Sequence, residues 1–354
     1  MDDDVEFESA SLFLAYNFLR TIKDEYRDFC LECMNFNIDY PYNCEMSMEY
    51  MDRNGIHGIY AKNAQIRSSL IYLGIDTFHS NQFGGWWGCI LPAKFIRKDN
   101  LPLPLFFQFD DQEYSFRNKL QYIMLNGLAV WHEGFYKKIV PSKMYFWFRN
   151  AFITIALRKF RSYTKFKDSF VHEFKVALTQ FDYDKAECML DGFDDYLKGP
   201  DFVFNRDNAF RTFKKALSHN KKFKPLYTLK GYQDIDYNNL CRHNHLHGFK
   251  KKVFNFTLNG HAFPLPRKNK PAFAFYDAED KRPYYRNSNV VAINPHFITY
   301  EERKFDFKRG FNLFVRLKRL LLKEAFIHKK LISEYENSYK KVTSYEFWKE
   351  YLNI

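Results

Sequence analysis

The chain has 354 residues, 46% of them hydrophobic, which is enough to bury a core in one large or two smaller domains and excludes a disordered chain. No run approaches the roughly eighteen uncharged apolar residues of a spanning helix, so any membrane contact is expected to be peripheral. The formal net charge of +12 suits a phosphate-bearing partner, whether nucleic acid, an anionic lipid surface or a lipid-diphosphate acceptor, although any single basic cluster is more often a solvated surface. Six scattered cysteines without a signal segment predict reduced thiols in the cytoplasm.

An acidic run, Asp2-Asp3-Asp4, opens the chain and has two interpretations. It is either an exposed acidic tail, or the end of a strand from which Asp2 and Asp4 offer oxygen ligands to one hard divalent ion. His132, at the end of an apolar strand, would be the third member of that set, although a histidine in such a place is more often simply hydrogen-bonded. The residues alone leave both interpretations open.

The first long element is a predicted amphipathic helix from Phe7 to Phe29, with Leu12, Tyr16 and Leu19 on its apolar side. The CxxC spacing that follows, CLEC, has no second pair or histidine and is expected to be structural rather than a zinc site.

A tryptophan pair, Trp86 and Trp87, follows two glycines that allow close backbone approach. The segment Trp87–Pro92 is typical of a short buried strand, so the two rings should point to opposite sides, one inward and one toward a cleft.

A pair of aspartates, Asp110 and Asp111, follows the proline-rich run LPLPLFF. A helix is predicted to start near Asp111 and to include Arg117. Its dipole favours carboxylates in the first turn, which is a sufficient structural reason for these acids but does not require two together.

The remaining pattern predicts an α/β protein whose second half is mostly helical, with a small antiparallel subdomain. The expected elements are a strand-turn-strand over Ile123–Trp131, helices over Met144–Phe160, Asp168–Leu197 and Asn208–Leu217, strands over Val253–His261, Ala272–Tyr276 and Val290–Ile293, and a basic helical region over Phe305–Leu352 whose apolar row is Phe311, Phe314, Leu317, Leu321 and Phe326. Alternate histidines in RHNHLH are expected to form a polar loop rather than a metal site.

Several short motifs occur in one order: MDDD, an MxMExxDR-like element, GGWWGCILP, LPLPLFFQFDDQEY, LNGLAVWH and YFWFRN. In this order they resemble the bacterial galactofuranosyltransferases of glycosyltransferase family two, over residues 1 to about 155. The resemblance implies the C-terminal part of a GT-A catalytic domain over residues 1–155, followed by a mostly helical domain over 156–354 with a β subdomain near 250–295. It also implies a UDP-galactofuranose donor and a glycan or lipid-linked glycan acceptor.

The resemblance further implies roles for individual residues. A divalent cation, Mn²⁺ or Mg²⁺, would be held by Asp2, Asp4 and His132. Asp111 would be the general base of an inverting transfer, since such a reaction needs a carboxylate beside the acceptor hydroxyl and a cation at the leaving diphosphate. The acceptor site would be shaped by Asp110, Glu49, Trp86 and Trp87.

Two departures qualify the resemblance. The family has a histidine where this chain has Trp147, and its nucleotide-binding region would precede Met1, so the chain is expected to bind UDP poorly by itself. The alternatives are a transferase for another sugar, such as rhamnose or galactopyranose, and a non-catalytic remnant that binds glycan or lipid. No groove-reading motif is present, so a nucleic-acid partner is not expected.

Overall fold

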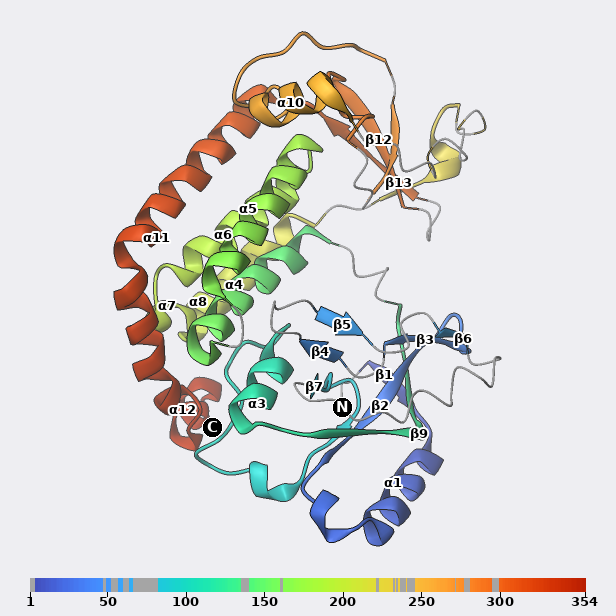
Figure 1. Cartoon of the computed structure of the whole chain (residues 1–354), viewed down its shortest axis with the longest axis vertical. Helices are drawn as coiled ribbons and strands as arrows, with labels where there is room; N and C mark the ends of the chain where they lie inside the picture. Colours follow the sequence, from blue (N-terminus) through green and yellow to red (C-terminus); the bar gives the residue numbers. More distant parts are fainter. Residues whose placement is uncertain are drawn as a thin grey trace.

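The computed structural model describes residues 4–46, 49–51, 57–59, 64–65, 82–134, 140–159, 162–220, 223–231, 233, 235, 240, 246–270, 272–276, 281–294 and 299–354. A mixed sheet lies at one end of the molecule, a small second sheet at the other, and helices connect them along one side (Figure 1). The expected α/β class is confirmed, and helices dominate the second half.

The N-terminal sheet is mixed, with strand order β1-β9-β2-β3-β6 and β8 paired to β2. Strand β2 is buried along its whole length and pairs in parallel with β9, while β1 pairs with β9 in the antiparallel sense. The acidic start of the chain is thereby brought to the end of β9. The strands are β1 (Val5–Phe7), β2 (Cys30–Asn37), β3 (Asn43–Met46), β6 (Ala64–Gln65), β8 (Cys89–Ile90) and β9 (Tyr122–His132).

Strand β9 corrects the predicted strand-turn-strand, because the Asn-Gly pair does not reverse the chain. Glu32 lies opposite Met124, but Met34 lies opposite Ala129, so two positions of β2 match five of β9 and the additional residues form a bulge. Gly127 has a φ of +92° within this bulge. Asn-Gly therefore serves here as a bulge that keeps the strand direction.

Helix α1 (Ser9–Thr21) confirms a helix in the predicted region but buries a different side. Leu12 and Tyr16 are 56% and 58% exposed, so their expected place in the core is wrong. The buried side carries the small residues Ser11 and Ala15, and the Ser11 hydroxyl donates to the Gly127 carbonyl at 3.0 Å. Close packing on the bulge selects small side chains over large apolar ones.

A three-stranded antiparallel sheet, with order β5-β4-β7, adjoins the candidate site and brings Glu49 opposite Phe83. Helix α3 (Asp110–Asn118) starts where the sequence predicted a helix near Asp111. The other short elements are β4 (Glu49–Met51), β5 (His57–Ile59), β7 (Gln82–Phe83), and the 3₁₀ turns η1 (Asp24–Tyr26) and η2 (Ala93–Phe95).

The helical half is built around aromatic rings. Phe152 packs against Phe193 and Tyr196, with ring centroids 4.7 and 5.3 Å apart. The predicted helix over Asp168–Leu197 is two helices, because Phe181 takes a φ of 59° and the Asp182 side chain caps the next helix. The helices are α4 (Pro141–Arg158), α5 (Tyr163–Thr179), α6 (Tyr183–Tyr196), α7 (Pro200–Val203) and α8 (Arg206–Ser218).

The C-terminal region is helical as predicted, in two pieces: α11 (Phe307–Val342) runs along one side of the molecule and α12 (Tyr345–Leu352) folds back beneath it (Figure 1). The predicted apolar row is only partly buried. Leu317 lies in the core, but Phe326 is 88% exposed, because the buried row is the neighbouring one that contains Leu313 and Leu320.

The second sheet has strand order β10-β13-β12-β11. The strands predicted at 272–276 and 290–293 are confirmed, but β11 and β12 pair in parallel, so the sheet is mixed rather than antiparallel. The predicted strand over Val253–His261 is wrong: Asn259-Gly260 follows a helix, ending it with residues of positive φ. The elements are α10 (Gly248–Thr257), β10 (Lys224–Pro225), β11 (Phe273–Phe275), β12 (Asn289–Asn294), β13 (Thr299–Lys304) and the turn η4 (Leu226–Thr228).

Among the described residues, no helix combines the length and apolarity needed to cross a bilayer. The five cysteines in the described part of the chain are free thiols. Cys33 of the CxxC pair lies on the buried strand β2, and burial raises the pKa of its thiol to about 12. This environment agrees with the structural interpretation of the pair. Two of the RHNHLH histidines, His243 and His245, lie outside the described residues.

Candidate functional site

The acidic start of the chain meets the end of β9. The Asp4 Oδ1 atom lies 3.4 Å from His132 Nε2, and Val5 pairs with His132 in the register of β1 and β9. The His132 side chain is 4% exposed and that of Asp4 is 49% exposed, so the pair lies at the surface with the imidazole inserted. The structure therefore brings together two of the three residues expected to hold a cation.

The surroundings of His132 suit metal binding. Its Nδ1 atom lies 2.5 Å from the Glu133 carbonyl oxygen, which can only accept, so Nδ1 carries the proton. In the neutral ring the Nε2 lone pair then lies on the side of Asp4, and this tautomer can ligate a divalent ion through Nε2. A carboxylate beside an imidazole fits Mn²⁺, and fits Mg²⁺ less well because that ion prefers oxygen. Asp2, the third expected ligand, lies outside the described residues.

A second group of acids forms beneath the double glycine. Glu32, on β2, is 0% exposed, and a Cβ atom built on Gly84 would lie only 2.0 Å from its Oε2 atom. Glu49 is 4% exposed and pairs in register with Phe83, the residue before Gly84. Gly84 therefore closes over Glu32 in a way that no larger residue could without displacing it, and Gly85 is packed in the same way against the Trp87 ring.

Burial raises the pKa of Glu32 well above its ordinary value, and the charges of Asp111 and then Glu49 raise it further. The backbone N–H of Gly85 acts in the opposite direction and lowers the pKa. Within the described part of the chain, neither side-chain oxygen of Glu32 has a partner at full hydrogen-bonding distance and angle. The structure thus gathers two expected site residues, Asp111 and Glu49, around an acid that favours its neutral form.

Glu32 was missed by the sequence analysis, which treated CLECMNFN only as a CxxC segment. A signal was present: Glu32 is the only charged residue in this eight-residue strand, and isolated ionisable groups in buried strands are often functional. Its partners are distant in sequence, so the signal gives no role by itself.

Asp110 and Asp111 begin α3, and the segment before them is held in an unusual conformation. Phe106, Gln108 and Phe109 all have positive φ, between 61° and 69°. Such conformations are costly for residues other than glycine and persist only when the surroundings fix them. The acid pair is therefore placed by its context rather than by local preference.

Helix α4 supplies that context. The Asn150 amide donates to the carbonyls of Phe107 and Gln108 at 2.7 and 2.9 Å, and the Trp147 ring packs against Phe109 with centroids 5.0 Å apart. Trp147, at the position where the resemblance implies a histidine, thus contacts the residue directly before Asp110.

Glu113, the third acid of this cluster, has a structural role. It is 0% exposed and binds Arg158 at 2.6 Å and Arg117 at 3.3 Å. These ion pairs join the first turn of α3 to the end of α4. Glu113 lies in the first turn of α3, as Asp111 does, but the side chains around it are cationic.

The tryptophan pair lies in a turn before β8, and its two rings enter different apolar clusters. Trp87 is 7% exposed and donates to the Cys33 carbonyl at 2.8 Å. Trp86 packs edge-on against Tyr114 of α3 at 5.4 Å, and its Nε1 atom has no hydrogen-bond partner within the described residues. The two rings separate as expected, but through a turn rather than a strand, and both pack in apolar clusters. Trp86 is the one beside the helix of Asp111.

A third acidic group also has ligand spacing. Asp184, Glu187 and His219 have potential ligand atoms within 4.8 Å of one another. However, the Arg309 guanidinium lies 2.6 Å from Asp184 and 3.0 Å from Glu187. A fixed cationic side chain already supplies the charge that a metal would bring, so this group joins α6 to α11.

Comparison with known proteins gives two partial matches. The chain is 24% identical over 247 residues to Galactofuranosyltransferase GlfT2 of Mycolicibacterium smegmatis, covering 64% of this chain and 36% of that protein. It is 24% identical over 227 residues to the protein of the same name from Mycobacterium tuberculosis, covering 58% of this chain and 34% of that one. No protein-family model matches the chain. The matched region spans about a third of each relative, and at this identity the matches support a relationship to glycosyltransferases.

Proposed function

We propose that the chain carries the acceptor side and catalytic base of a GT-A glycosyltransferase that moves galactofuranose from UDP-galactofuranose to a growing surface glycan, with inversion. The observation that carries this proposal is the position of Glu32 beneath Gly84, with Glu49 in register opposite Phe83 and the charges of Asp111 and Glu49 acting on Glu32. Glu32 lies on the sheet whose first strand brings Asp4 to His132. The partial matches to galactofuranosyltransferases agree with it.

In this proposal Asp111 accepts the proton of the acceptor hydroxyl. Glu32, whose pKa is raised by burial and by the nearby acids, takes up a proton more readily than an exposed carboxyl, and Glu49 and Asp110 bind acceptor hydroxyls. Trp86, half-buried against Tyr114, offers the exposed part of its ring to the sugar, while Trp87 anchors the turn through the Cys33 carbonyl. Aromatic faces and carboxylates together are typical of carbohydrate sites.

The test of the base is Asp111→Asn, which keeps the shape and removes the basicity. Transfer should fall by about 10²–10⁴-fold, the range for loss of general base catalysis, while donor binding is retained. The control is Asp99→Asn, a fully exposed acid paired with Arg97. Because the chain is expected to bind UDP poorly by itself, the parent and both variants are assayed together with the nucleotide-binding region that the resemblance places before Met1. Turnover of Asp111→Asn equal to the parent would remove Asp111 from this role, and inactivity of that combined protein on every nucleotide sugar would remove the transferase proposal.

The donor is tested with a matched panel of UDP-galactofuranose, UDP-galactopyranose and a rhamnosyl nucleotide. A kcat/KM at least tenfold higher for the furanose supports the proposal. A preference for either other sugar would retain the transferase and replace its donor.

The same proposal places a divalent cation at Asp4 and His132, with Asp2 completing the set. When bound, the cation would neutralise the negative charge of the leaving diphosphate. Thermal unfolding tests this without turnover, because a ligand at 100 times its Kd stabilises the folded state by about 2.7 kcal/mol. Mn²⁺ should raise the Tm of the parent but not of His132→Gln, and an equal rise in both would contradict the site.

Peripheral contact with an anionic membrane is proposed for α10. Phe249 and Phe256 are 79% and 73% exposed, and three lysines at 250–252 lie between them in sequence. Such a surface suits headgroup phosphates and the acyl boundary. Replacing both phenylalanines by serine should reduce co-sedimentation with anionic vesicles, and unchanged co-sedimentation would exclude α10.

A further inference from the structure

A cavity of about 580 Å³ lies between α4, α8, α12 and the segment that precedes α3. Three of the phenylalanines around it are unusually exposed: Phe106 by 56%, Phe210 by 61% and Phe213 by 43%. Phe146, beneath them, packs against Phe213 with centroids 5.7 Å apart. Several exposed aromatic rings around one cavity indicate a surface to which a ligand or partner binds.

The floor of this cavity carries a buried cation. Arg149 is 4% exposed and donates to the Asn150 amide oxygen at 2.8 Å and to the Tyr145 hydroxyl at 3.2 Å. No carboxylate pairs with it in the described part of the chain. The Tyr145 hydroxyl donates onward to Asp195, whose charge is already matched by Lys198 at 2.6 Å. A buried guanidinium without its own counter-charge is costly unless an anion approaches it.

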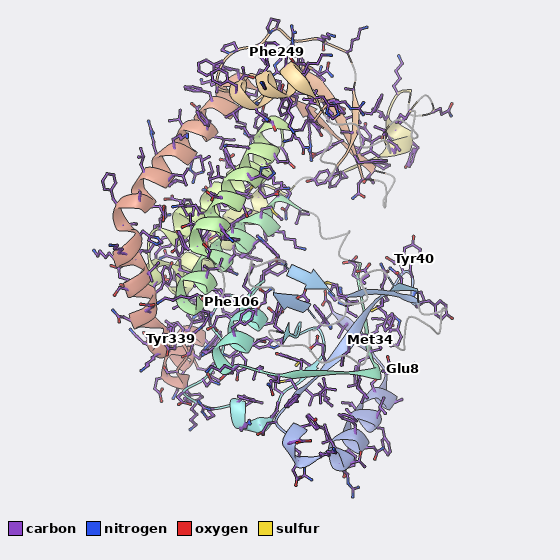
Figure 2. The ribbon with its side chains drawn as sticks, in the orientation of Figure 1. Glu8, Met34, Tyr40, Phe106, Phe249 and Tyr339 are labelled. Carbon is purple, nitrogen blue, oxygen red and sulfur yellow. The ribbon has the colours of Figure 1, made fainter. Side chains whose placement is uncertain are left out.

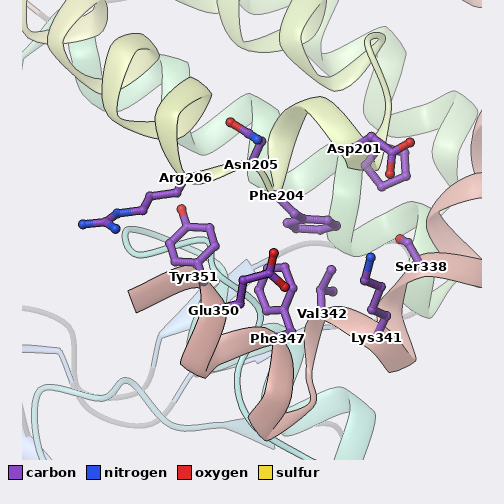
Figure 3. A pocket seen from close by; sticks show the side chains of 11 residues that line it. Asp201, Phe204, Asn205, Arg206, Ser338, Lys341, Val342, Phe347, Glu350 and Tyr351 are labelled. Atoms are coloured by element: carbon purple, nitrogen blue, oxygen red, sulfur yellow. The ribbon is translucent and has the colours of Figure 1, made fainter. Parts of the chain in front are cut away.

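The rim of the cavity carries a second cation. Arg206 makes no hydrogen bond or ion pair with any described residue, and Figure 3 shows it extending past the Tyr351 ring, beside a smaller hollow of about 260 Å³ that shares both residues. Burial raises the pKa of Tyr351, and the charges of Arg149 and Arg206 oppose that rise, so both guanidinium groups act on one phenol. Asp207 is the single acid among the described residues of the lining.

The cavity also borders the segment that positions the acid pair. Phe106 lies where the sheet half meets the helices (Figure 2), and its ring contacts Trp348 and Tyr351 with centroids 5.7 Å from each. It is the first of the residues with positive φ before Asp110. A molecule seated on Phe106 would therefore contact the strained segment directly.

We propose that this cavity binds a phosphate ester of an apolar chain, with the phosphate between Arg206, Tyr351 and Arg149 and the chain on the phenylalanine rings. Guanidinium groups bind phosphate oxygens through paired N–H donors, and the phenylalanine rings provide apolar surface against which the chain of the ligand can be buried. The site does not depend on the proposed transferase, because neither Asp111 nor the Asp4–His132 pair contributes to its lining.

Calorimetry with octyl phosphate tests the site, with octanol and inorganic phosphate as the two halves of the ligand. Octyl phosphate should bind with one-to-one stoichiometry and at least tenfold more tightly than either half. The variants Arg206→Gln and Phe210→Ala alter exposed side chains and should each weaken binding at least tenfold. The matched control is Phe326→Ala on the exposed side of α11, 88% exposed, which should bind like the parent.

Octanol binding as tightly as octyl phosphate, or an affinity unaffected by both variants, would overturn the site. Vesicles containing phosphatidylglycerol distinguish the two sources of the ligand. In the background of Phe249→Ser and Phe256→Ser, where α10 no longer contributes, co-sedimentation that Phe210→Ala abolishes would identify a lipid headgroup in a membrane. Octyl phosphate binding with co-sedimentation indifferent to Phe210 would identify a free phosphate ester.

Discussion

The acids of α6 and the acids around Glu32 on β2 differ in the charges that surround them. On α6, each acid faces a base from another element or the next turn: Asp184 meets Arg309, Asp191 meets Arg316, and Asp195 meets Lys198. Around β2, the pKa of Glu32 is governed by burial and by two further acids, with no base among its causes.

This difference distinguishes acids with a structural role from acids of the candidate functional site better than the number of carboxylates does. The group at Asp184, Glu187 and His219 has the spacing of a metal site, but Arg309 holds two of its members. Glu113 lies two residues after Asp111 and is likewise held by arginines. Acids whose charge is matched by an arginine or a lysine fasten helices together, whereas burial and repulsion by nearby carboxylates raise the pKa of Glu32.

The largest effect is expected for a fully matched and buried pair. Arg303 binds Asp182 at 3.0 Å, and the side chains are 2% and 5% exposed. Arg303→Met should lower the free energy of unfolding by about 3–5 kcal/mol, because it leaves Asp182 buried without its partner. Urea denaturation measures this. The control is Lys224→Met, which breaks an exposed pair with Glu302 and should cost at most about 1 kcal/mol. Equal costs for the two variants would contradict the comparison.

A smaller effect is expected where Gly84 packs against Glu32. Gly84→Ala places a methyl group against Glu32 and within 2.6 Å of Tyr122, and overpacking of this kind costs about 1–3 kcal/mol. Gly248→Ala is the matched control: it has positive φ but open space around it, so only backbone strain of about 1 kcal/mol applies. If Gly84→Ala unfolds at the same urea concentration as the parent, Gly84 does not enclose Glu32.

The smallest effect depends on pH. Because the folded pKa of Glu32 lies above its ordinary value, the folded state holds its proton more tightly, and stability is lost as pH rises from about 4.5 through the raised pKa. Glu32→Gln removes this loss, so its stability relative to the parent should increase across that window, by about 1.4 kcal/mol for each pH unit that the window spans. Thermal unfolding of both chains at several pH values checks the slope. Parallel curves would show that Glu32 ionises as an exposed acid does.

Local signals were sufficient for many elements and failed where distant contacts decide. Helix α3 was predicted because acids mark its first turn. Helix α8 was predicted only from Asn208, and in the structure it begins earlier, at Arg206, with Asn205 as its N-cap. The Asn-Gly pairs misled twice, since at Gly127 the chain continues along β2 and at Gly260 it leaves a helix. Only the neighbours of each pair determine which of the three uses of this dipeptide applies.

The candidate site was predictable to a similar extent. Motif order placed Asp4 near His132, and the two lie 3.4 Å apart. Glu32 could not be assigned, because its character comes from enclosure by Gly84 and from the charges of Asp111 and Glu49, none of them local in sequence. The cation roles of Asp2, Asp4 and His132 and the base role of Asp111 stay predictions.

The bulge in β9 has a consequence for how mutations in this chain would fail. Side chains alternate between the two faces of a strand, so deleting or adding one residue between Met124 and Ala129 would turn His132 to the face opposite Asp4 while leaving Tyr122 beside Cys30. The sheet could still form its hydrogen bonds, but the side chains after the bulge would point to the opposite faces from those they occupy now. Length in this short segment therefore matters more than the identity of its side chains, and Leu125–Leu128 behave as a spacer that sets the phase of the strand.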